Sequence, residues 1–313
     1  MTLYDLPAPA KLNLFLHVVG RRKDGYHLLQ SVFRLVSLSD SISIDLRRDG
    51  QTSCQTDRCA QAQEPPDIVL QAANLLQQVT GCRLGAHIDV RKRIPVGGGL
   101  GGGSSDAATV LMALNRLWRT GLSRQRLMQV GLRLGADVPF FIYGRSAFVQ
   151  GIGEQMDLVD LPDLSYLIIQ PAVAVSTAGI FGSPDLTRDS EPVKISDFSG
   201  VSHFVSPAKA SSGVTQASSG FGRNDLQLQV EVAYPRVRAA INWAQDNGLA
   251  VRLSGSGACF FAEFDEPQQA ELARSVLAAK MESFNEHGQH RVVEQVLACD
   301  GLREHPLRQW VKN

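Results

Sequence analysis

The chain has 313 residues, of which 44% are hydrophobic and 20% are charged. These values are typical of a globular protein and exclude disordered, collagen-like and coiled-coil classes. Lys plus Arg and Asp plus Glu number 31 each, so the chain as a whole lacks the basic charge that favours nucleic-acid binding. The length predicts about two domains.

The N-terminal segment and the cysteines bear on location. The first twenty residues have no basic stretch, and their apolar run from Leu12 to Val19 is interrupted by Asn13 and His17. This pattern indicates neither a signal peptide nor a membrane span. The five cysteines show no CxxC spacing, which favours a reducing compartment over a disulfide framework. We therefore expect a cytoplasmic protein with no membrane partner.

Hydrophobic periodicity predicts a mixture of strands and helices in the first half. Alternating apolar residues predict strands over 10–19, from 41 onward and over 86–96. Helical spacing predicts helices over 67–81, 104–118 and 125–134, the second of them capped by Ser104 or Ser105. The apolar run over 139–149 predicts a further strand.

A second domain is expected to begin near residue 158, giving domains of residues 1–158 and 159–313. Strands are predicted from residue 165, on both sides of the SGSG turn at 254–257, and from 291, and helices over 234–248 and 267–279. Residues 199–222 contain seven Ser and four Gly, which predicts a mobile surface insertion. The HxxH pair His287 and His290 predicts a solvated helix end or loop rather than a metal site.

The most distinctive segment is PVGGGLGGGSSDAA at residues 95–108, in which six of the seven residues from 97 to 103 are glycine. Glycine permits positive φ and lets a ligand approach the backbone. Because the cluster stands between a predicted strand and helix, its N–H groups and the helix dipole predict a site for a phosphate chain. Ser104 and Ser105 add hydroxyls for phosphate oxygens or Mg²⁺, and Asp106 would favour the dipole or help to hold the cation. The alternative is a glycine hinge or close backbone packing.

Other phosphate-binding motifs fit less well. Gly97, Gly99 and Gly102 satisfy GxGxxG, but the preceding strand alternates with charged residues and no acidic residue lies near position 122. The GK[ST] of a Walker loop and the HRD and DFG of protein kinases are absent. The segment therefore predicts a phosphate loop of another kind.

Five segments together resemble a known family. PAKLNLFL from Pro9, PVGGGLGGGSSDAA from Pro95 and RLSGSGACFFAEF from Arg252 are similar to the three motifs of the GHMP small-molecule kinases. DGYHLLQSVF from Asp24 and LGADVPFFIYG from Leu134 resemble one branch of that family, which acts on a cytidine-diphosphate-linked erythritol. The resemblance implies an α+β fold with an N-terminal domain like domain 2 of ribosomal protein S5 and a ferredoxin-like C-terminal domain. It also implies ATP- and Mg²⁺-dependent phosphorylation of a 2-hydroxyl on the route to isoprenoids.

The resemblance also implies which residues act. Asp137 in GADVP would accept the hydroxyl proton, and Lys11 in PAKLN would stabilise the developing negative charge. Without the resemblance, Lys11 could be a solvated strand-edge lysine and Asp137 a helix cap. The implied ATP-binding residues are Lys92, Pro95, Val96, Gly97, Gly98, Gly99, Leu100, Gly101, Gly102, Gly103, Ser104 and Ser105.

At the other end of the substrate, the resemblance implies that Tyr26 and Phe181 stack on cytosine and that His27 reads its polar edge. Asn13 would hold the substrate near the reacting hydroxyl, and Thr177 would line the same pocket. From the residues alone, the two aromatic side chains are more often part of a core.

Three expectations stay open at this point. The SGSG turn either contributes N–H groups to the pocket or is only a turn between strands. Asp67 aligns with the region that contacts adenine or its ribose, where many relatives carry Asn. Another GHMP kinase activity and a nucleotide-sensing protein without catalysis are the alternatives; no metal site built from protein ligands is expected, and the oligomeric state is left open.

Overall fold

The computed structural model describes residues 1–57, 67–194, 208–209, 215–216, 222–286 and 291–313. Its strands are β1 (Thr2–Arg21), β2 (His27–Arg47), β3 (Thr52–Thr56), β4 (Gly85–Arg91), β5 (Ala147–Gly151), β6 (Gln155–Leu158), β7 (Ser165–Pro171), β8 (Ala208–Lys209), β9 (Thr215–Gln216), β10 (Arg252–Leu253), β11 (Phe260–Phe264) and β12 (Val293–Asp300). Its α-helices are α1 (Ile68–Thr80), α2 (Gly102–Leu117), α3 (Arg124–Leu132), α4 (Val138–Tyr143), α5 (Thr177–Phe181), α6 (Gln227–Ala233), α7 (Pro235–Asp246) and α8 (Pro267–Glu286), and a 3-10 turn follows at Arg308–Trp310.

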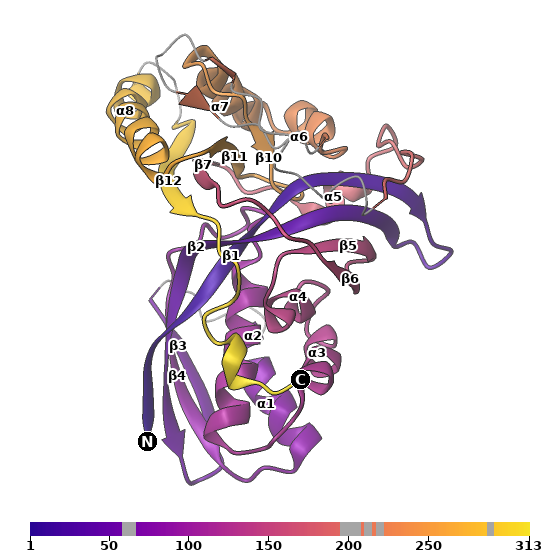
Figure 1. The fold of residues 1–313 in the computed structure, drawn as a ribbon, viewed down its shortest axis with the longest axis vertical. Helices are drawn as coiled ribbons and strands as arrows, with labels where there is room; N and C mark the ends of the chain where they lie inside the picture. The colour runs from indigo at the N-terminus through magenta and orange to yellow at the C-terminus, as the bar shows by residue number, and fades with distance from the viewer. Residues whose placement is uncertain (58–66, 195–207, 210–214, 217–221, 287–290) are drawn as a thin grey trace.

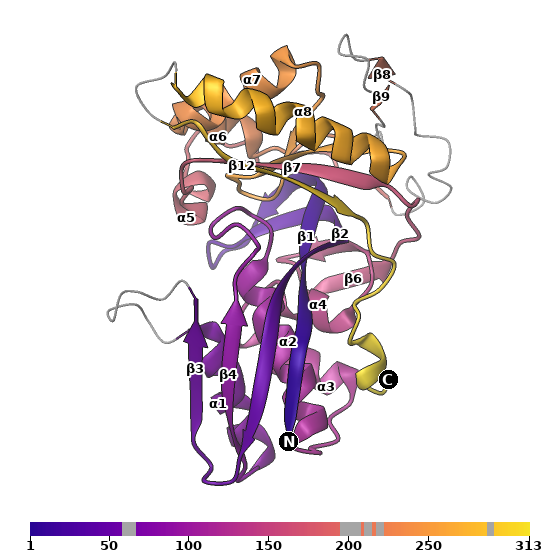
Figure 2. The ribbon, with the colours of Figure 1, turned by 90° about the vertical axis from the view of Figure 1, so that its left-hand side faces the viewer.

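A long antiparallel ribbon of β1 and β2 extends along much of the molecule (Figures 1 and 2). In most of β1 buried and less buried positions are mixed, but every residue from 8 to 16 is buried. Both faces of this central stretch are therefore covered. Polar side chains in such a stretch need partners, because an unpaired buried polar group costs free energy. Lys11 and Asn13 lie there, which already marks the middle of β1 as unusual.

The first sheet has the order β3-β4-β2-β5-β6, with β1 also paired to β2. Helices α1 to α4 lie together beside it (Figure 2). Helix α2 is the central one: twelve of its sixteen residues are buried, which shows that neighbouring elements enclose it on most sides. Ile42, Ile88 and Leu111 belong to the core that this sheet and these helices share.

The second sheet has the order β10-β11-β7-β12 and is antiparallel throughout. Helices α6, α7 and α8 lie on one side of it (Figure 1). Ile169, Phe260 and Leu277 are part of its core, and this core also includes Leu16 and Val18 of β1. The ribbon thus contributes side chains to the second sheet as well as to the first.

The C-terminal segment 301–313 returns to the first core, where Leu307 and Val311 are buried. The guanidinium of Arg124 on α3 donates to the carbonyl oxygens of Ile142, Arg308 and Val311 at 2.8–2.9 Å. The division into domains at residue 158 stays a prediction. The ribbon of β1 and β2 contributes to both cores, and residues 301–313 return from the second sheet to the first core.

Most predicted elements are confirmed, but the strand over 139–149 is wrong in its first half. Residues 138–143 form the short buried helix α4, with Pro139 near its start and Gly144 ending it at φ 71°. Only Ala147–Gly151 is a strand. A short continuous apolar run fits a buried helix as well as a buried strand, and proline in the first helical turn decides for the helix.

The predicted cap of α2 is also wrong. The helix begins at Gly102 after Gly101, whose φ is 72°, and no side chain caps it. Ser104 and Ser105 therefore lie inside the first turns rather than before them. Much of the predicted insertion 199–222 and the pair His287 and His290 fall outside the described residues. None of the described helices combines the length and apolar character that crossing a membrane requires.

Candidate active site

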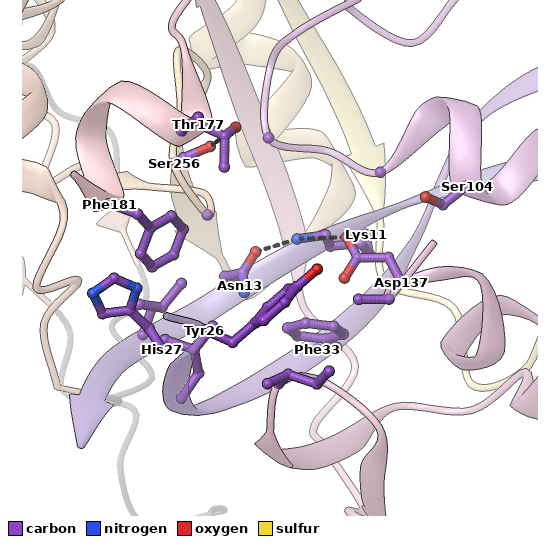
Figure 3. A pocket seen from close by; sticks show the side chains of 18 of the residues that line it. Lys11, Asn13, Tyr26, His27, Phe33, Ser104, Asp137, Thr177, Phe181 and Ser256 are labelled. Atoms are coloured by element: carbon purple, nitrogen blue, oxygen red, sulfur yellow. Dashed lines mark hydrogen bonds and ion pairs between the residues drawn. The ribbon is translucent and has the colours of Figure 1, made fainter. Parts of the chain in front are cut away.

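A cavity of about 770 Å³ opens between the ribbon, the glycine segment, the start of α4, helix α5 and the SGSG turn. Figure 3 shows its labelled side chains in a row, with His27 and Phe181 at one end, Lys11 and Asp137 further along, and Ser104 at the other end. The residues come from positions as distant as 11 and 256. The fold therefore brings together motifs that are separate in the sequence.

Lys11 and Asp137 face each other in this cavity. Lys11 Nζ lies 3.8 Å from Asp137 Oδ2, and the Lys11 side chain is 5% exposed against 33% for Asp137. Asp137 directly precedes α4 and makes no capping hydrogen bond, so its carboxylate is not engaged as a cap. The prediction that these two residues meet is supported by the geometry, and the two alternatives for them, an exposed lysine and a helix cap, are not.

Several contacts fix the ammonium group. Lys11 Nζ donates to Asn13 Oδ1 and lies 4.6 Å from the centre of the Phe33 ring. Asn13 in turn donates to Ser31 Oγ at 3.0 Å. The pairing of β1 with β2 shifts register on both sides of these residues, between Pro9 and Lys11 and between Asn13 and Leu16. Such bulges turn side chains away from the regular alternation, which explains how a buried strand directs polar groups into a cavity.

Burial lowers the pKa of Lys11 below its ordinary value of 10.5, and the nearby Asp137 acts in the opposite direction. Burial disfavours the charged form, whereas an adjacent carboxylate favours it. A cation in this position is weakly solvated and interacts strongly with negative charge that develops beside it. The pair is thus suited to proton transfer from a hydroxyl and to stabilising the resulting oxyanion.

The glycine segment has all its carbonyl groups engaged by protein. The oxygens of residues 97 to 101 accept hydrogen bonds, in order, from Ala258 N, Cys259 N, Ser254 Oγ, Lys11 N and Ser105 N. These carbonyls are bound to the protein, whereas the N–H groups of Gly102, Gly103 and Ser104, which precede Ser105 in the first turn of α2, have no partner within the helix and are the ones left for a ligand. This arrangement is that of an anion site at a helix N-terminus.

Two of the glycines are required by space as well as by conformation. Gly99 and Gly101 have φ of 74° and 72°, a region that L side chains rarely adopt. A Cβ atom on Gly99 would lie 2.2 Å from the carbonyl oxygen of Ser254, and one on Gly101 would lie 2.9 Å from the Phe141 ring. The SGSG turn therefore packs directly against the glycine segment, and both Gly255 and Ser256 of that turn line the cavity.

A buried charge cluster, which the sequence analysis missed, anchors both ends of the glycine segment. Lys92 Nζ lies 2.5 Å from Asp40 Oδ2 and 2.5 Å from Asp106 Oδ2. Asp40 Oδ1 also accepts from the N–H groups of Arg93 and Ile94. Burial raises the pKa of Asp106 to about 8 despite the nearby Lys92. The cluster links the residues before the segment to helix α2 after it.

The structure places some of the expected ATP ligands away from the cavity. The ammonium of Lys92 is held between the side chains of Asp40 and Asp106, and the hydroxyl of Ser105 is buried and donates to Pro9 O at 2.6 Å. Asp67 caps α1 by accepting from Val69 N at 2.9 Å. Ser104, by contrast, lines the cavity together with Gly99 and Gly101.

Of the remaining expected ligands, His27 and Phe181 lie at the end of the cavity away from Ser104 (Figure 3), and Asn13, Tyr26 and Thr177 also line the cavity. Tyr26 is 62% exposed and follows Gly25, whose φ is 93°. The rings of His27 and Phe181 have centres 5.0 Å apart. Thr177 Oγ1 lies 2.7 Å from Ser256 Oγ. Aromatic rings at one end of a cavity form a surface on which a flat ring can stack. Tyr26 is exposed, whereas Phe181 is partly buried and also packs against the core of the second sheet.

The cavity also includes residues to which the sequence analysis gave no role. Phe33 and Leu29 on β2, Arg21 and Asp24 near the ribbon turn, and Ile152 after β5 all line it. Asp24, Leu29 and Phe33 belong to the segment DGYHLLQSVF, whereas Arg21 and Ile152 lie outside the motifs already noted. The described residues contain no group of three or more His, Cys, Asp or Glu side chains arranged to hold a metal ion.

The fold and the cavity define a small-molecule kinase of the GHMP type. Residues 67–145 match the family model for the GHMP kinases N terminal domain, and residues 212–283 match that for the GHMP kinases C terminal domain. Among curated relatives, 4-diphosphocytidyl-2-C-methyl-D-erythritol kinase of Bordetella parapertussis is 52% identical and that of Aromatoleum aromaticum 48%. The alignments cover 99% of this chain and 99% and 97% of the relatives.

A solved structure agrees with these relatives. The crystal structure of a 4-(cytidine 5'-diphospho)-2C-methyl-D-erythritol kinase is 28% identical, has a TM-score of 0.73, and aligns over 96% of this chain and 99% of its own. The chain belongs to the 4-diphosphocytidyl-2-C-methyl-D-erythritol kinase family. The sequence-based prediction of an α+β, two-domain GHMP kinase fold is thereby confirmed.

Proposed function

We propose that this chain transfers the terminal phosphoryl group of ATP to the 2-hydroxyl of 4-diphosphocytidyl-2-C-methyl-D-erythritol, giving the 2-phosphate and ADP. The reaction belongs to the methylerythritol phosphate route to isopentenyl diphosphate. Family membership over the whole chain supports it. The observation that carries it is one cavity that holds the pair Lys11 and Asp137, the glycine segment, and the aromatic end with Tyr26 and Phe181.

In the proposed mechanism, Asp137 accepts the proton of the 2-hydroxyl as the new O–P bond forms. Lys11, buried and 3.8 Å from Asp137, stabilises the negative charge on the attacking oxygen and on the transferred group. Asn13, bonded to Lys11 and to Ser31, holds the acceptor in place. Most of the remaining catalysis is positioning, because phosphoryl transfer requires little covalent chemistry from the protein.

The glycine segment fits a triphosphate because its carbonyl groups are bound by protein and its N–H groups remain for the ligand. Glycine at positions 99 and 101 lets the segment pack closely against Ser254 and Phe141 and keep the positive φ that this backbone requires. Bound Mg²⁺ would neutralise phosphate charge. The described residues contain no cluster of acidic or His side chains that could hold a metal ion. The phosphates would therefore be the main ligands of Mg²⁺, with the hydroxyl of Ser104 nearby.

The aromatic end would bind the cytidine. Tyr26 and Phe181 would stack on the base, His27 would hydrogen-bond its polar edge, and Thr177 would close the same part of the pocket. A stacking surface gives affinity for any base, so the choice of base depends on the hydrogen-bonding group.

The test is turnover by the purified protein with ATP and Mg²⁺. We expect ADP and the 2-phosphate, identified by ³¹P NMR, from the cytidylyl substrate. Homoserine, mevalonate and galactose serve as competing acceptors, because they are substrates of other kinases with this type of fold. Phosphorylation of one of these in place of the cytidylyl substrate would refute the proposal. We place the reaction in the cytoplasm, where ATP is available and where the free thiols of Cys54, Cys82, Cys259 and Cys299 stay reduced.

A further inference from the structure

Arg188 lies behind the aromatic end of the cavity, in the connection that follows α5. Its guanidinium donates to Phe181 O at 3.2 Å, to Ser183 O at 2.6 Å and to Leu186 O at 3.0 Å. Its Nε donates to His27 Nε2 at 3.1 Å. One half-buried side chain therefore contacts both His27, from the ribbon, and the end of the helix that carries Phe181.

The contact with His27 fixes the position of a proton. Arginine stays protonated in proteins and has no acceptor, so the hydrogen bond requires a lone pair on His27 Nε2. A neutral imidazole carries its single proton on the other nitrogen in that case. His27 then offers an N–H donor at Nδ1.

We propose that Arg188 is a positioning residue that holds His27 in the Nδ1–H tautomer and thereby makes the pocket select cytosine over uracil. The proposal rests on the function proposed above. Cytosine has an acceptor at ring position N3, whereas uracil carries N–H there. A fixed donor on the protein pairs with the first and opposes the second, and a buried donor left unpaired is costly. Stacking on Tyr26 and Phe181 cannot make this distinction, because both bases have a similar face.

The charges around His27 act in the same direction. Burial, Arg188 and Arg21 all lower the pKa of His27 below its ordinary value of 6.5. Asp24 lines the same cavity but lies 2.7 Å from Arg22. The neutral ring therefore predominates at and above neutral pH. Protonation at lower pH would place N–H groups of His27 and Arg188 against each other.

The kinetic test compares the cytidylyl substrate with its uridylyl analogue in Arg188→Met. We expect the ratio of their kcat/KM values to fall by about tenfold or more, through a higher KM for the cytidylyl substrate and with kcat retained. Arg236→Met is the matched control, since Arg236 also donates to a backbone carbonyl, Ala172 O at 3.4 Å, but Ala172, unlike His27 and Phe181, does not line the cavity. Equal losses for both substrates in Arg188→Met would show a structural role and overturn the proposal.

The spectroscopic test does not depend on the variant's folding. In ¹⁵N-histidine NMR of the unaltered protein, with His27 assigned by His27→Gln, we expect a protonated Nδ1 and an unprotonated Nε2 at pH 7.5. The opposite tautomer would overturn the proposal. In Arg188→Met, we expect mixed tautomers and a higher His27 pKa. If the unaltered protein phosphorylated neither substrate, the proposed function would fail. This inference would still be decided by two measurements, the tautomer of His27 and the affinity for CDP relative to UDP.

Discussion

Replacing Lys11 with Met removes one charge from the centre of the cavity and little else. In the unaltered protein the Lys11 ammonium lies 4.6 Å from the centre of the Phe33 ring. Methionine keeps a long apolar side chain beside that ring. The ammonium is 3.8 Å from Asp137 Oδ2. At this separation, and at an effective dielectric constant of about 20, two unit charges interact with about 4 kcal/mol. The developing charge on a hydroxyl bound between Lys11 and Asp137 would lose at most a similar amount.

Since about 1.4 kcal/mol corresponds to tenfold in rate, we expect kcat of Lys11→Met to fall by up to about three orders of magnitude. The KM for ATP should stay within about threefold, because in the proposed complex backbone N–H groups, and not Lys11, bind the phosphates. Coupled measurement of ADP release gives both constants, and thermal denaturation checks the fold. Lys280→Met, which removes an exposed ammonium bonded to Asn247 Oδ1 at 2.8 Å, is the control. A kcat within tenfold of the unaltered enzyme would refute the electrostatic role of Lys11.

Three further substitutions test the site. Asp137→Asn should lower kcat by at least about a thousandfold while ATP still binds in calorimetry; normal turnover would identify another base. Gly99→Ala should abolish ATP binding measured in the same way, because its Cβ would lie 2.2 Å from Ser254 O at a φ of 74°, and retained affinity would contradict the packing. Burial raises the pKa of Asp106 to about 8 from 3.8, so unfolding lets this carboxyl ionise and the protein loses stability as pH rises between these values. Asp106→Asn has no such carboxyl and lacks that loss. The free energy of unfolding in urea, taken as variant minus unaltered protein, should therefore be larger at pH 8.5 than at pH 5. An equal difference at both pH values would show that Asp106 is already ionised in the folded protein.

The glycine segment was predictable because its chemistry is local. Consecutive glycines between a strand and a helix specify positive φ and free N–H groups without reference to distant residues. The boundaries of α1 follow similarly from spacing and from the residues Asp67 and Gly81 that flank it. Family resemblance was needed for Lys11 and Asp137, because a lysine in a strand and an aspartate before a helix have ordinary explanations.

The contacts that a sequence pattern cannot show are those between distant polar residues. Asp40 is 52 positions from Lys92, and His27 is 161 positions from Arg188. Each of these residues alone indicates an exposed charge. Helix α4 was missed for another reason: FFIY has the composition of a strand, and the signals for a helix are Pro139 in the first turn and Gly144 at the end.

The return of residues 301–313 to the first core has a consequence for synthesis. Arg124 joins this segment to Ile142 of α4, the helix that Asp137 precedes. Chains generally fold from the N-terminus as they leave the ribosome, yet here the core that includes α4, next to the proposed catalytic Asp137, lacks Leu307 and Val311 until almost the whole chain has been made. The nascent first half would therefore carry its lysine, its glycine segment and its carboxylate in an unfinished core, and the site would reach its final geometry only after translation of the last segment.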